Sequence, residues 1–102
     1  MIRKSRITVP MEQIEEFCKK YHIRQLSLFG SVLGPDFKPE SDVDVLVEFE
    51  AGYRVGLLKM ARIERELSGV LQRKVDLRTP GELSRYFRQQ VLDSAEVQYA
   101  RG

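Results

Sequence analysis

Cysteine and long apolar segments are scarce in this sequence, and each scarcity excludes a class of protein. The 102 residues include one cysteine, which rules out an internal disulfide and fits a reducing compartment. No apolar run approaches the length of a membrane span, and the basic opening MIRKSRITVP lacks the apolar stretch of a signal peptide. We therefore expect a cytoplasmic protein that does not enter a membrane.

A large excess of charge is also missing. The chain has 17 Lys and Arg residues against 15 Asp and Glu residues, whereas a duplex-binding domain usually carries a stronger basic stripe. We therefore expect no direct binding to DNA. Repeats, low-complexity segments and Pro/Gly/Ser linkers are absent as well. The length suits one domain over residues 1–102, with a flexible N-terminus at residues 1–9. Its modest core would gain stability from self-association or from a partner protein.

What the sequence does contain is an alternation of helical and extended patterns. Apolar residues recur at helical spacing over residues 11–21 and 57–71, which predicts two amphipathic helices. Short apolar or alternating runs predict strands at residues 25–30, 42–49 and 73–79, and a short edge strand at 96–100. This alternation favours an α/β or α+β fold, in which helices cover one side of a small sheet.

A third helix is predicted by its start signals. Thr79 is a candidate N-cap, Pro80 suits the first helical position, and Glu82 completes a capping box. We expect this helix to run from Pro80 to about Ser94. The side chains expected in the core are Leu83, Tyr86 or Phe87, and Val91.

Two carboxylates interrupt an otherwise apolar strand. Asp42 and Asp44 lie two residues apart in DVDVLVEF, so both side chains point to the same face, with Cα atoms about 6.5–7 Å apart. They repel each other unless a cation lies between them. Asp76 faces out of another short strand, and if that strand pairs beside residues 43–49, three carboxylates meet on one face. Such hard oxygen ligands suit Mg²⁺ or Mn²⁺, the ions of phosphoryl-transfer sites.

A glycine–serine pair follows the apolar run QLSLF. Glycine at the end of a strand lets the backbone approach a phosphate, and the N–H groups and hydroxyl that come after it can bind it. Each motif is weak alone, because Ser41-Asp42 could simply start a strand and Gly30-Ser31 could be an ordinary turn. Combined with Asp76, the two motifs leave a catalytic and a purely structural interpretation open.

The order of these residues resembles the signature of the minimal nucleotidyltransferases of the DNA polymerase β superfamily. The signature reads Gly30-Ser31, ten further residues, then DVD at residues 42–44. The resemblance continues through PESDVDVLVEF, GLLKMARIERELSGVLQRKVDLRTP and LSRYFRQQVL, so it covers roughly residues 11 to 100. It implies the polymerase β-like nucleotidyltransferase fold, a small mixed sheet flanked by helices.

The resemblance also implies roles for individual residues. Gly30 and Ser31 would hold a nucleoside triphosphate such as ATP. Asp42, Asp44 and Asp76 would bind Mg²⁺ or Mn²⁺, and Asp76 would be a candidate base for the incoming hydroxyl. Many relatives have a small residue and an Arg-Gly pair after Gly-Ser, where this sequence reads VLGP over residues 32–35. A basic contact to the phosphates is therefore missing, and Lys38 is a candidate replacement.

Small members of this family resemble the antitoxin half of toxin–antitoxin pairs, whose partner is typically a HEPN-domain ribonuclease. The resemblance implies an enzyme that transfers AMP from ATP to a tyrosine hydroxyl of that toxin, with pyrophosphate leaving. Two alternatives stay open. One is a binding module that neutralises its partner by contact, and the other is an enzyme that modifies a small molecule such as an aminoglycoside. Large relatives of the latter kind have an added helical domain that this chain lacks.

Other polar residues receive structural interpretations. Cys18 and His22 lie four apart on one helix, but a chain with one cysteine and one histidine does not build a four-ligand zinc site. We expect Cys18 in the core and His22 at the surface. Glu48 shares the face of Asp44 but lies too far along the strand to bind the metal. Arg73, Lys74 and Arg78 flank Asp76, and we favour a solvated strand edge for them over a contact to phosphate. Arg85 and Arg88 could face a partner, but we assign them to a solvated face of the last helix.

Overall fold

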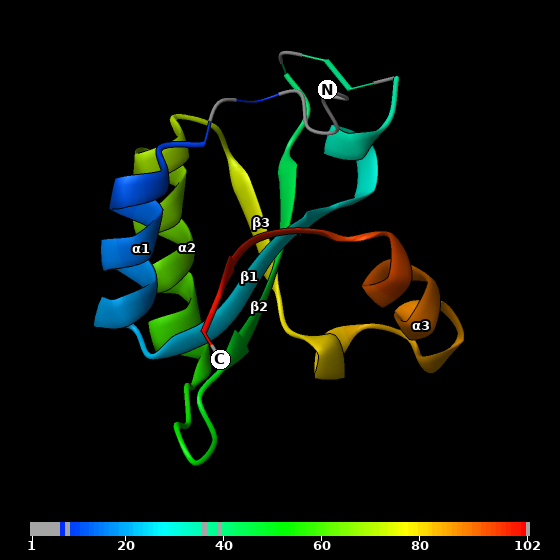
Figure 1. The fold of residues 1–102 in the computed structure, drawn as a ribbon. Helices are drawn as coiled ribbons and strands as arrows, with labels where there is room; N and C mark the ends of the chain where they lie inside the picture. Colours follow the sequence, from blue (N-terminus) through cyan, green and yellow to red (C-terminus); the bar gives the residue numbers. More distant parts are fainter. Residues whose placement is uncertain (1–6, 8, 36, 39, 102) are drawn as a thin grey trace.

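The computed structural model describes residues 7, 9–35, 37–38 and 40–101. Figure 1 shows a sheet with two helices packed on one side and a third helix standing on the other. The elements, in chain order, are α1 (Met11–Lys20), β1 (Ile23–Phe29), a 3₁₀ turn (Gly30–Leu33), β2 (Val43–Phe49), α2 (Leu57–Leu71), β3 (Val75–Arg78), a second 3₁₀ turn (Pro80–Glu82), α3 (Arg85–Ser94) and β4 (Glu96–Ala100). The predicted flexible N-terminus lies almost wholly outside the described residues.

The sheet is mixed, with the strand order β3-β2-β1-β4. β1 pairs antiparallel with both β2 and β4, whereas β2 and β3 are parallel. A parallel pair needs a crossover connection, and α2 supplies it between β2 and β3. The predicted class, a small mixed sheet with flanking helices, is confirmed, and β4 is the edge strand that its sequence predicted.

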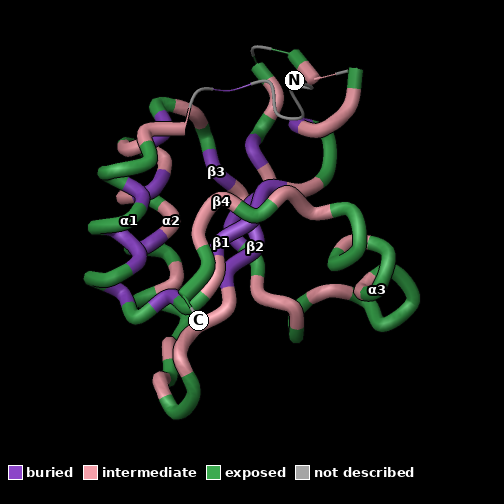
Figure 2. Tube along the Cα trace, viewed as in Figure 1, coloured by how far each residue is buried: buried purple, intermediate pink, exposed green. Residues whose placement is uncertain are grey.

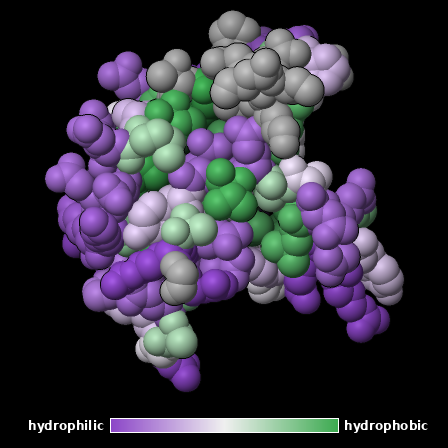
Figure 3. Space-filling model, viewed as in Figure 1, coloured by the Kyte–Doolittle hydropathy of each residue, from purple (hydrophilic) through white to green (hydrophobic). Residues whose placement is uncertain are grey.

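The core lies between the sheet and the two helices α1 and α2 (Figure 2). Ile14, Phe17 and Cys18 of α1 are buried, as the helical spacing predicted. Ile63, Leu67 and Leu71 are the buried residues of α2, whose bounds match the predicted ones. The outer side of α1 is largely hydrophilic (Figure 3). None of the helices in the described part of the chain is long and apolar enough to span a membrane.

The prediction for the segment after β3 was partly wrong. The capping signals act on a 3₁₀ turn alone: the Thr79 N–H donates to the Glu82 carboxylate at 2.8 Å, but the chain becomes extended at Leu83. Ser84 then caps a separate helix by accepting from the Tyr86 N–H, so α3 starts at Arg85. The chain therefore turns away from the sheet before α3 begins.

The predicted burial of this segment was also wrong. The side chains of Tyr86 and Phe87 are 81% and 61% exposed, and no residue of α3 is buried. α3 stands on the other side of the sheet from α1 and α2 (Figure 1), so the helices do not all cover one side as the sequence suggested. Met11 and Leu57, the first residues of α1 and α2, continue the helical spacing of the apolar faces but are exposed.

A polar contact joins α1 to α2 and makes stability depend on pH. The carboxylate of Glu66 accepts from the Tyr21 hydroxyl at 2.6 Å and from Lys20 Nζ at 3.1 Å. The Tyr21 hydrogen bond is the main reason that the pKa of Glu66 lies below its ordinary value of 4.5. The unfolded chain therefore binds the proton more tightly than the folded one. The stabilisation by Glu66 is present above its ordinary pKa and is lost as the pH falls through the folded-state pKa.

We expect Glu66→Gln to reduce the loss of stability on acidification. The measurement is the free energy of unfolding by urea between about pH 3 and pH 7, because the linkage acts within that window. Glu16→Gln is the matched control, since Glu16 is exposed on the outer side of α1. An unchanged slope for Glu66→Gln would show that the contact does not couple stability to pH.

Candidate active site

The pairing of β2 with β3 brings two of the predicted site residues together. In the parallel register Asp44 lies opposite Asp76, and the flanking pairs are Val43 with Val75 and Val45 with Leu77. Neighbouring strands are about 4.8 Å apart, so the two carboxylates start from adjacent backbone positions. The valines and Leu77 point into the core with α1 and α2, and the two aspartates point to the opposite face.

Asp42 precedes β2 by one residue and is exposed. Its spacing from Asp44 places it at the same end of the sheet. The pKa of Asp44 is raised, first by burial and then by the charge of Asp76, while a hydrogen bond from the Ser31 N–H lowers it and Asp42 raises it further. The charges of the other two predicted aspartates therefore both act on Asp44. Their shared negative charge is what a bound cation would offset.

Gly30 and Ser31 lie directly against Asp44. Gly30 directly follows β1 and opens the 3₁₀ turn with a φ of 77°, which favours glycine. A Cβ atom at this position would lie 2.3 Å from Oδ2 of Asp44. The next residue donates its backbone N–H to the same carboxylate. The glycine therefore permits a close approach between the turn and the acidic strand, which joins the two predicted motifs in one place.

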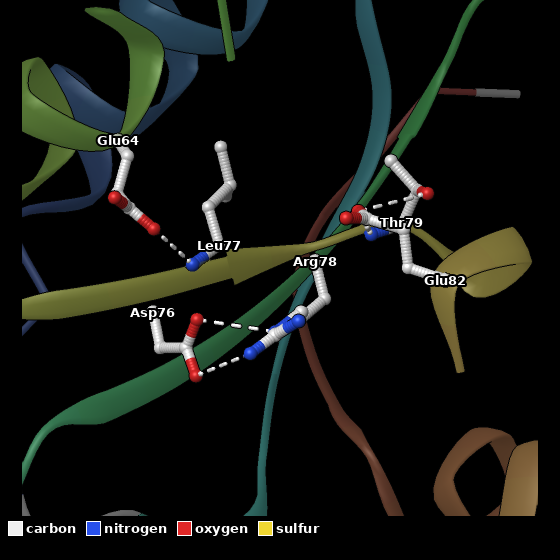
Figure 4. A network of polar contacts seen from close by, with 6 residues as sticks. All are labelled: Glu64, Asp76, Leu77, Arg78, Thr79 and Glu82. Atoms are coloured by element: carbon white, nitrogen blue, oxygen red, sulfur yellow. Dashed lines mark hydrogen bonds and ion pairs between the residues drawn. The ribbon is translucent and has the colours of Figure 1, made fainter. Parts of the chain in front are cut away.

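Asp76 also has a cationic neighbour on its own strand. Arg78 Nε lies 3.1 Å from Oδ1 of Asp76, and Nη2 lies 3.3 Å from Oδ2 (Figure 4). Both side chains lie on one side of β3, and Glu64 approaches the Leu77 N–H from the other side. The interpretation of Arg78 as part of a solvated strand edge was therefore incomplete, because this guanidinium pairs with a predicted site residue.

Arg73 has a structural role that sequence reasoning missed. Its Nη2 donates to the backbone carbonyls of Lys38 and Ser41, both at 3.1 Å, and its guanidinium lies 4.7 Å from the centre of the Phe37 ring. These contacts attach the loop before Asp42 to the turn between α2 and β3. The acceptors are carbonyls 35 and 32 positions away, so no local sequence signal could have identified them.

The remaining candidates lie outside this group. Glu48 pairs with Arg24 at 2.6 Å, further along the strand, as its position predicted. Cys18 is buried, and burial raises the pKa of its thiol to about 12, so it behaves as a small apolar residue. His22 is exposed and stacks on Tyr53 with ring centroids 4.3 Å apart.

The chemistry of the aspartate group fits a divalent cation, although its present geometry is not a finished ligand set. Hard carboxylate oxygens with mutual repulsion are ligands that Mg²⁺ and Mn²⁺ prefer. Within residues 7, 9–35, 37–38 and 40–101, however, no three Asp, Glu, His or Cys side chains are arranged ready to hold a metal. The ion pair of Asp76 with Arg78 engages one of the three carboxylates. Binding of a cation would therefore require side-chain rearrangement.

An apolar cleft of about 440 Å³ lies elsewhere, between the start of α2 and the end of β3. Its lining includes Leu77, which points away from the face of Asp76. The two glutamates that line the cleft, Glu64 and Glu82, each accept a backbone N–H hydrogen bond. The cleft therefore does not share the face of the aspartates, and we place the candidate site at the aspartates.

Comparison with known proteins agrees with this geometry. The profile of the family described as nucleotidyltransferase domain matches residues 10–97. A Methanocaldococcus jannaschii protein named "Putative protein adenylyltransferase MJ0435" is 34% identical over 76 residues, which cover 74% of this chain and 80% of the relative. The chain therefore belongs to the nucleotidyltransferase domain family, as one of the minimal nucleotidyltransferases of the DNA polymerase β superfamily.

Solved structures share the fold. One described as "putative minimal nucleotidyltransferase" is 34% identical, with a TM-score of 0.68 over 83% of this chain and 85% of that chain. Another is a complex of tri-AMPylated Shewanella oneidensis HEPN toxin with MNT antitoxin, with a TM-score of 0.63, 21% identity, and coverage of 88% of this chain and 69% of that one. The polymerase β-like nucleotidyltransferase fold predicted from the sequence is confirmed.

Proposed function

We propose that the protein transfers AMP from ATP to a hydroxyl group of a partner protein, a tyrosine of a HEPN-domain toxin. The observation that carries the proposal is the register of β2 and β3, which sets Asp44 beside Asp76 with Gly30 and Ser31 packed against them. The name of the M. jannaschii relative supports transfer to a protein, and the Shewanella complex, which contains an AMPylated HEPN toxin, supports the partner.

Each residue of the site has a distinct role in this proposal. The backbone of Gly30 and Ser31 and the serine hydroxyl hold the triphosphate, and Asp42, Asp44 and Asp76 hold Mg²⁺ or Mn²⁺. Bound there, the cation supplies positive charge that stabilises the phosphates during transfer. Asp76 accepts the proton of the attacking hydroxyl. The acceptor oxygen forms a bond to the α-phosphorus, the bond from that phosphorus to the β-phosphate oxygen breaks, and pyrophosphate leaves.

A protein acceptor suits the open face on which the aspartates lie. Small substrates are usually bound in concave, mostly apolar pockets. The apolar cleft beside α2 does not share the face of the aspartates, and Asp42 is exposed. A macromolecular partner would bring its own hydroxyl to this exposed face. The arrangement therefore favours a protein acceptor over a small molecule such as an antibiotic.

The proposal is tested by incubating the purified protein with ATP, Mg²⁺ and the protein encoded by the adjacent gene. We expect intact-protein mass spectrometry to show a gain in mass equal to AMP on the partner, and peptide analysis to assign it to a tyrosine. The control is the variant Asp42→Asn/Asp44→Asn, which should give no modified partner. The proposal fails if the wild-type protein gives no gain in mass on the partner. If the variant still neutralises the partner to the wild-type extent, neutralisation occurs by contact and catalysis is incidental to it.

A further inference from the structure

Arg78 lies among the carboxylates at the end of β3. It comes two residues after Asp76, so both side chains emerge on the same face of the strand, and two guanidinium nitrogens contact the two carboxylate oxygens. The pKa of Arg78 is raised, mainly by its hydrogen bond with Asp76 and by the charge of that residue. The charges of Glu82 and Asp44 raise it further. Arg78 is therefore a positive side chain that belongs to the candidate site and not to a remote surface.

The turn beside the site offers no positive side chain of its own. The segment GSVLGPDF, residues 30–37, contains neither lysine nor arginine, and Lys38, the replacement suggested by the sequence, follows it as an exposed residue. The Arg73 guanidinium contacts the carbonyls of Lys38 and Ser41, and so holds the loop. A bound triphosphate would bring several negative charges to the face where Asp42 and Asp76 already act on Asp44. A guanidinium within reach of that face is the group best shaped to meet phosphate oxygens, because it can donate two parallel hydrogen bonds.

The ion pair between Arg78 and Asp76 is weak enough to break when another ligand binds. The side chains are 47% and 36% exposed, and ion pairs with that access to solvent are weak. While the pair is closed, it holds the Asp76 carboxylate that a divalent cation would need. Arg78 and a divalent cation therefore compete for the Asp76 carboxylate.

We propose that Arg78 exchanges partners at the candidate site: it pairs with Asp76 in the free protein and contacts the triphosphate once the aspartates bind a divalent cation. Arg78 is thus a nucleotide-binding residue that also holds Asp76 before binding. It takes the part of the basic contact that residues 32–35 do not provide. The inference rests on the nucleotidyl transfer proposed above, but it concerns binding and does not depend on the identity of the acceptor.

Two binding titrations of the full chain test this exchange. The first measures Mn²⁺ alone by electron paramagnetic resonance, and the second measures a non-hydrolysable ATP analogue at saturating Mn²⁺ by calorimetry. For Arg78→Gln we expect Mn²⁺ to bind about two- to five-fold more tightly, because a weak competing cation is gone. We expect the nucleotide analogue to bind at least about ten-fold more weakly, because a charge-assisted hydrogen bond to phosphate is lost.

Tighter binding of Mn²⁺ together with weaker binding of the nucleotide analogue would distinguish this proposal from a purely structural role of Arg78. If Arg78 only supported the fold, Arg78→Gln would weaken both ligands, and that result would overturn the proposal, as would an unchanged nucleotide affinity. Arg78→Lys keeps the charge without the planar fork and should restore part of the nucleotide affinity. Arg62→Gln makes the same change in net charge on an exposed position of α2 and should alter neither titration.

The two titrations also distinguish failure of the Arg78 exchange from failure of the proposed AMP transfer. If the wild-type protein binds Mn²⁺ and nucleotide with the expected responses to Arg78→Gln but never modifies its partner, the acceptor is wrong and the exchange stands. If the wild-type protein binds no nucleotide, the exchange is overturned together with catalysis. Far-ultraviolet circular dichroism of each variant shows whether the fold is retained, and Arg78→Lys provides the comparison if Arg78→Gln does not fold.

Discussion

Asp44→Asn is expected to abolish most of the transferase activity without destabilising the domain. The carboxylate is half-buried between Asp76 and Asp42, and both of these charges raise its pKa. The amide keeps the shape of the side chain and still has an oxygen for the Ser31 N–H, but it removes a negative charge. Loss of one group that organises transition-state charge typically costs about 10²- to 10³-fold in rate, and we expect an effect of that size on AMP transfer.

The same substitution should not lower the free energy of unfolding, although it lowers the activity. A raised pKa means that the folded protein binds the proton of Asp44 more tightly than the unfolded chain does. The contribution of Asp44 to the stability of the wild-type protein is therefore full below its ordinary pKa of 3.8 and is lost as the pH rises through the higher folded-state pKa, so at neutral pH the charge of Asp44 opposes folding. Asn removes this opposition. The free energy of unfolding in the absence of divalent cations should be equal to or above that of the wild type.

The measurements are the rate of AMP transfer and urea unfolding at neutral pH. Asp93→Asn serves as the control, because Asp93 is an exposed acid on α3 that accepts a hydrogen bond from Gln89 of the same helix. It should change neither quantity appreciably. Wild-type activity in Asp44→Asn would remove Asp44 from the catalytic group, and a large loss of stability would show that its charge supports the fold. Separation of activity from stability is typical of sites where like charges are held together for function.

The parts of the fold that periodicity predicted are those where the core decides the pattern. α2 begins and ends at the predicted residues because Ile63, Leu67 and Leu71 repeat at helical spacing against the sheet. Asp44 and Asp76 could be assigned to one face because alternation along a strand fixes the direction of every side chain. The pairing of their strands remained conditional, because it depends on contacts between distant segments, and the register now supplies it.

The segment after β3 could not be predicted in the same way. Thr79 and Glu82 carry a correct local signal for a helical start, yet one 3₁₀ turn satisfies that signal, and the signal does not determine the conformation of the chain beyond Glu82. Apolar residues at helical spacing in α3 predicted a buried face, but periodicity does not specify whether the sheet lies within reach of it. The pairing of Arg78 with Asp76, by contrast, was accessible from the sequence, since residues two apart on a strand share a face.

Gly30→Ala is expected to damage the site and the fold together, through two separable causes. The first is backbone conformation, because a φ of 77° is unfavourable for alanine and costs about 1–3 kcal/mol. The second is contact, because the new Cβ would lie 2.3 Å from Oδ2 of Asp44, so the carboxylate or the turn must move. Misplacement of a catalytic group by about 1 Å can cost about 10²-fold in rate. We therefore expect both a lower free energy of unfolding and a rate of AMP transfer reduced by about that factor.

Gly52→Ala separates the two causes. Gly52 has a similar φ of 82°, but a Cβ atom there meets no atom within 4 Å. This control should lose stability through the backbone alone and keep its AMP transfer, whereas Gly30→Ala should lose both. Urea unfolding and the transfer assay on the two variants give the comparison. Equal activities would mean that the close approach of Gly30 to Asp44 is a requirement of folding only. A selective loss in Gly30→Ala would show that the glycine is needed because the acidic strand and the turn after β1 must touch.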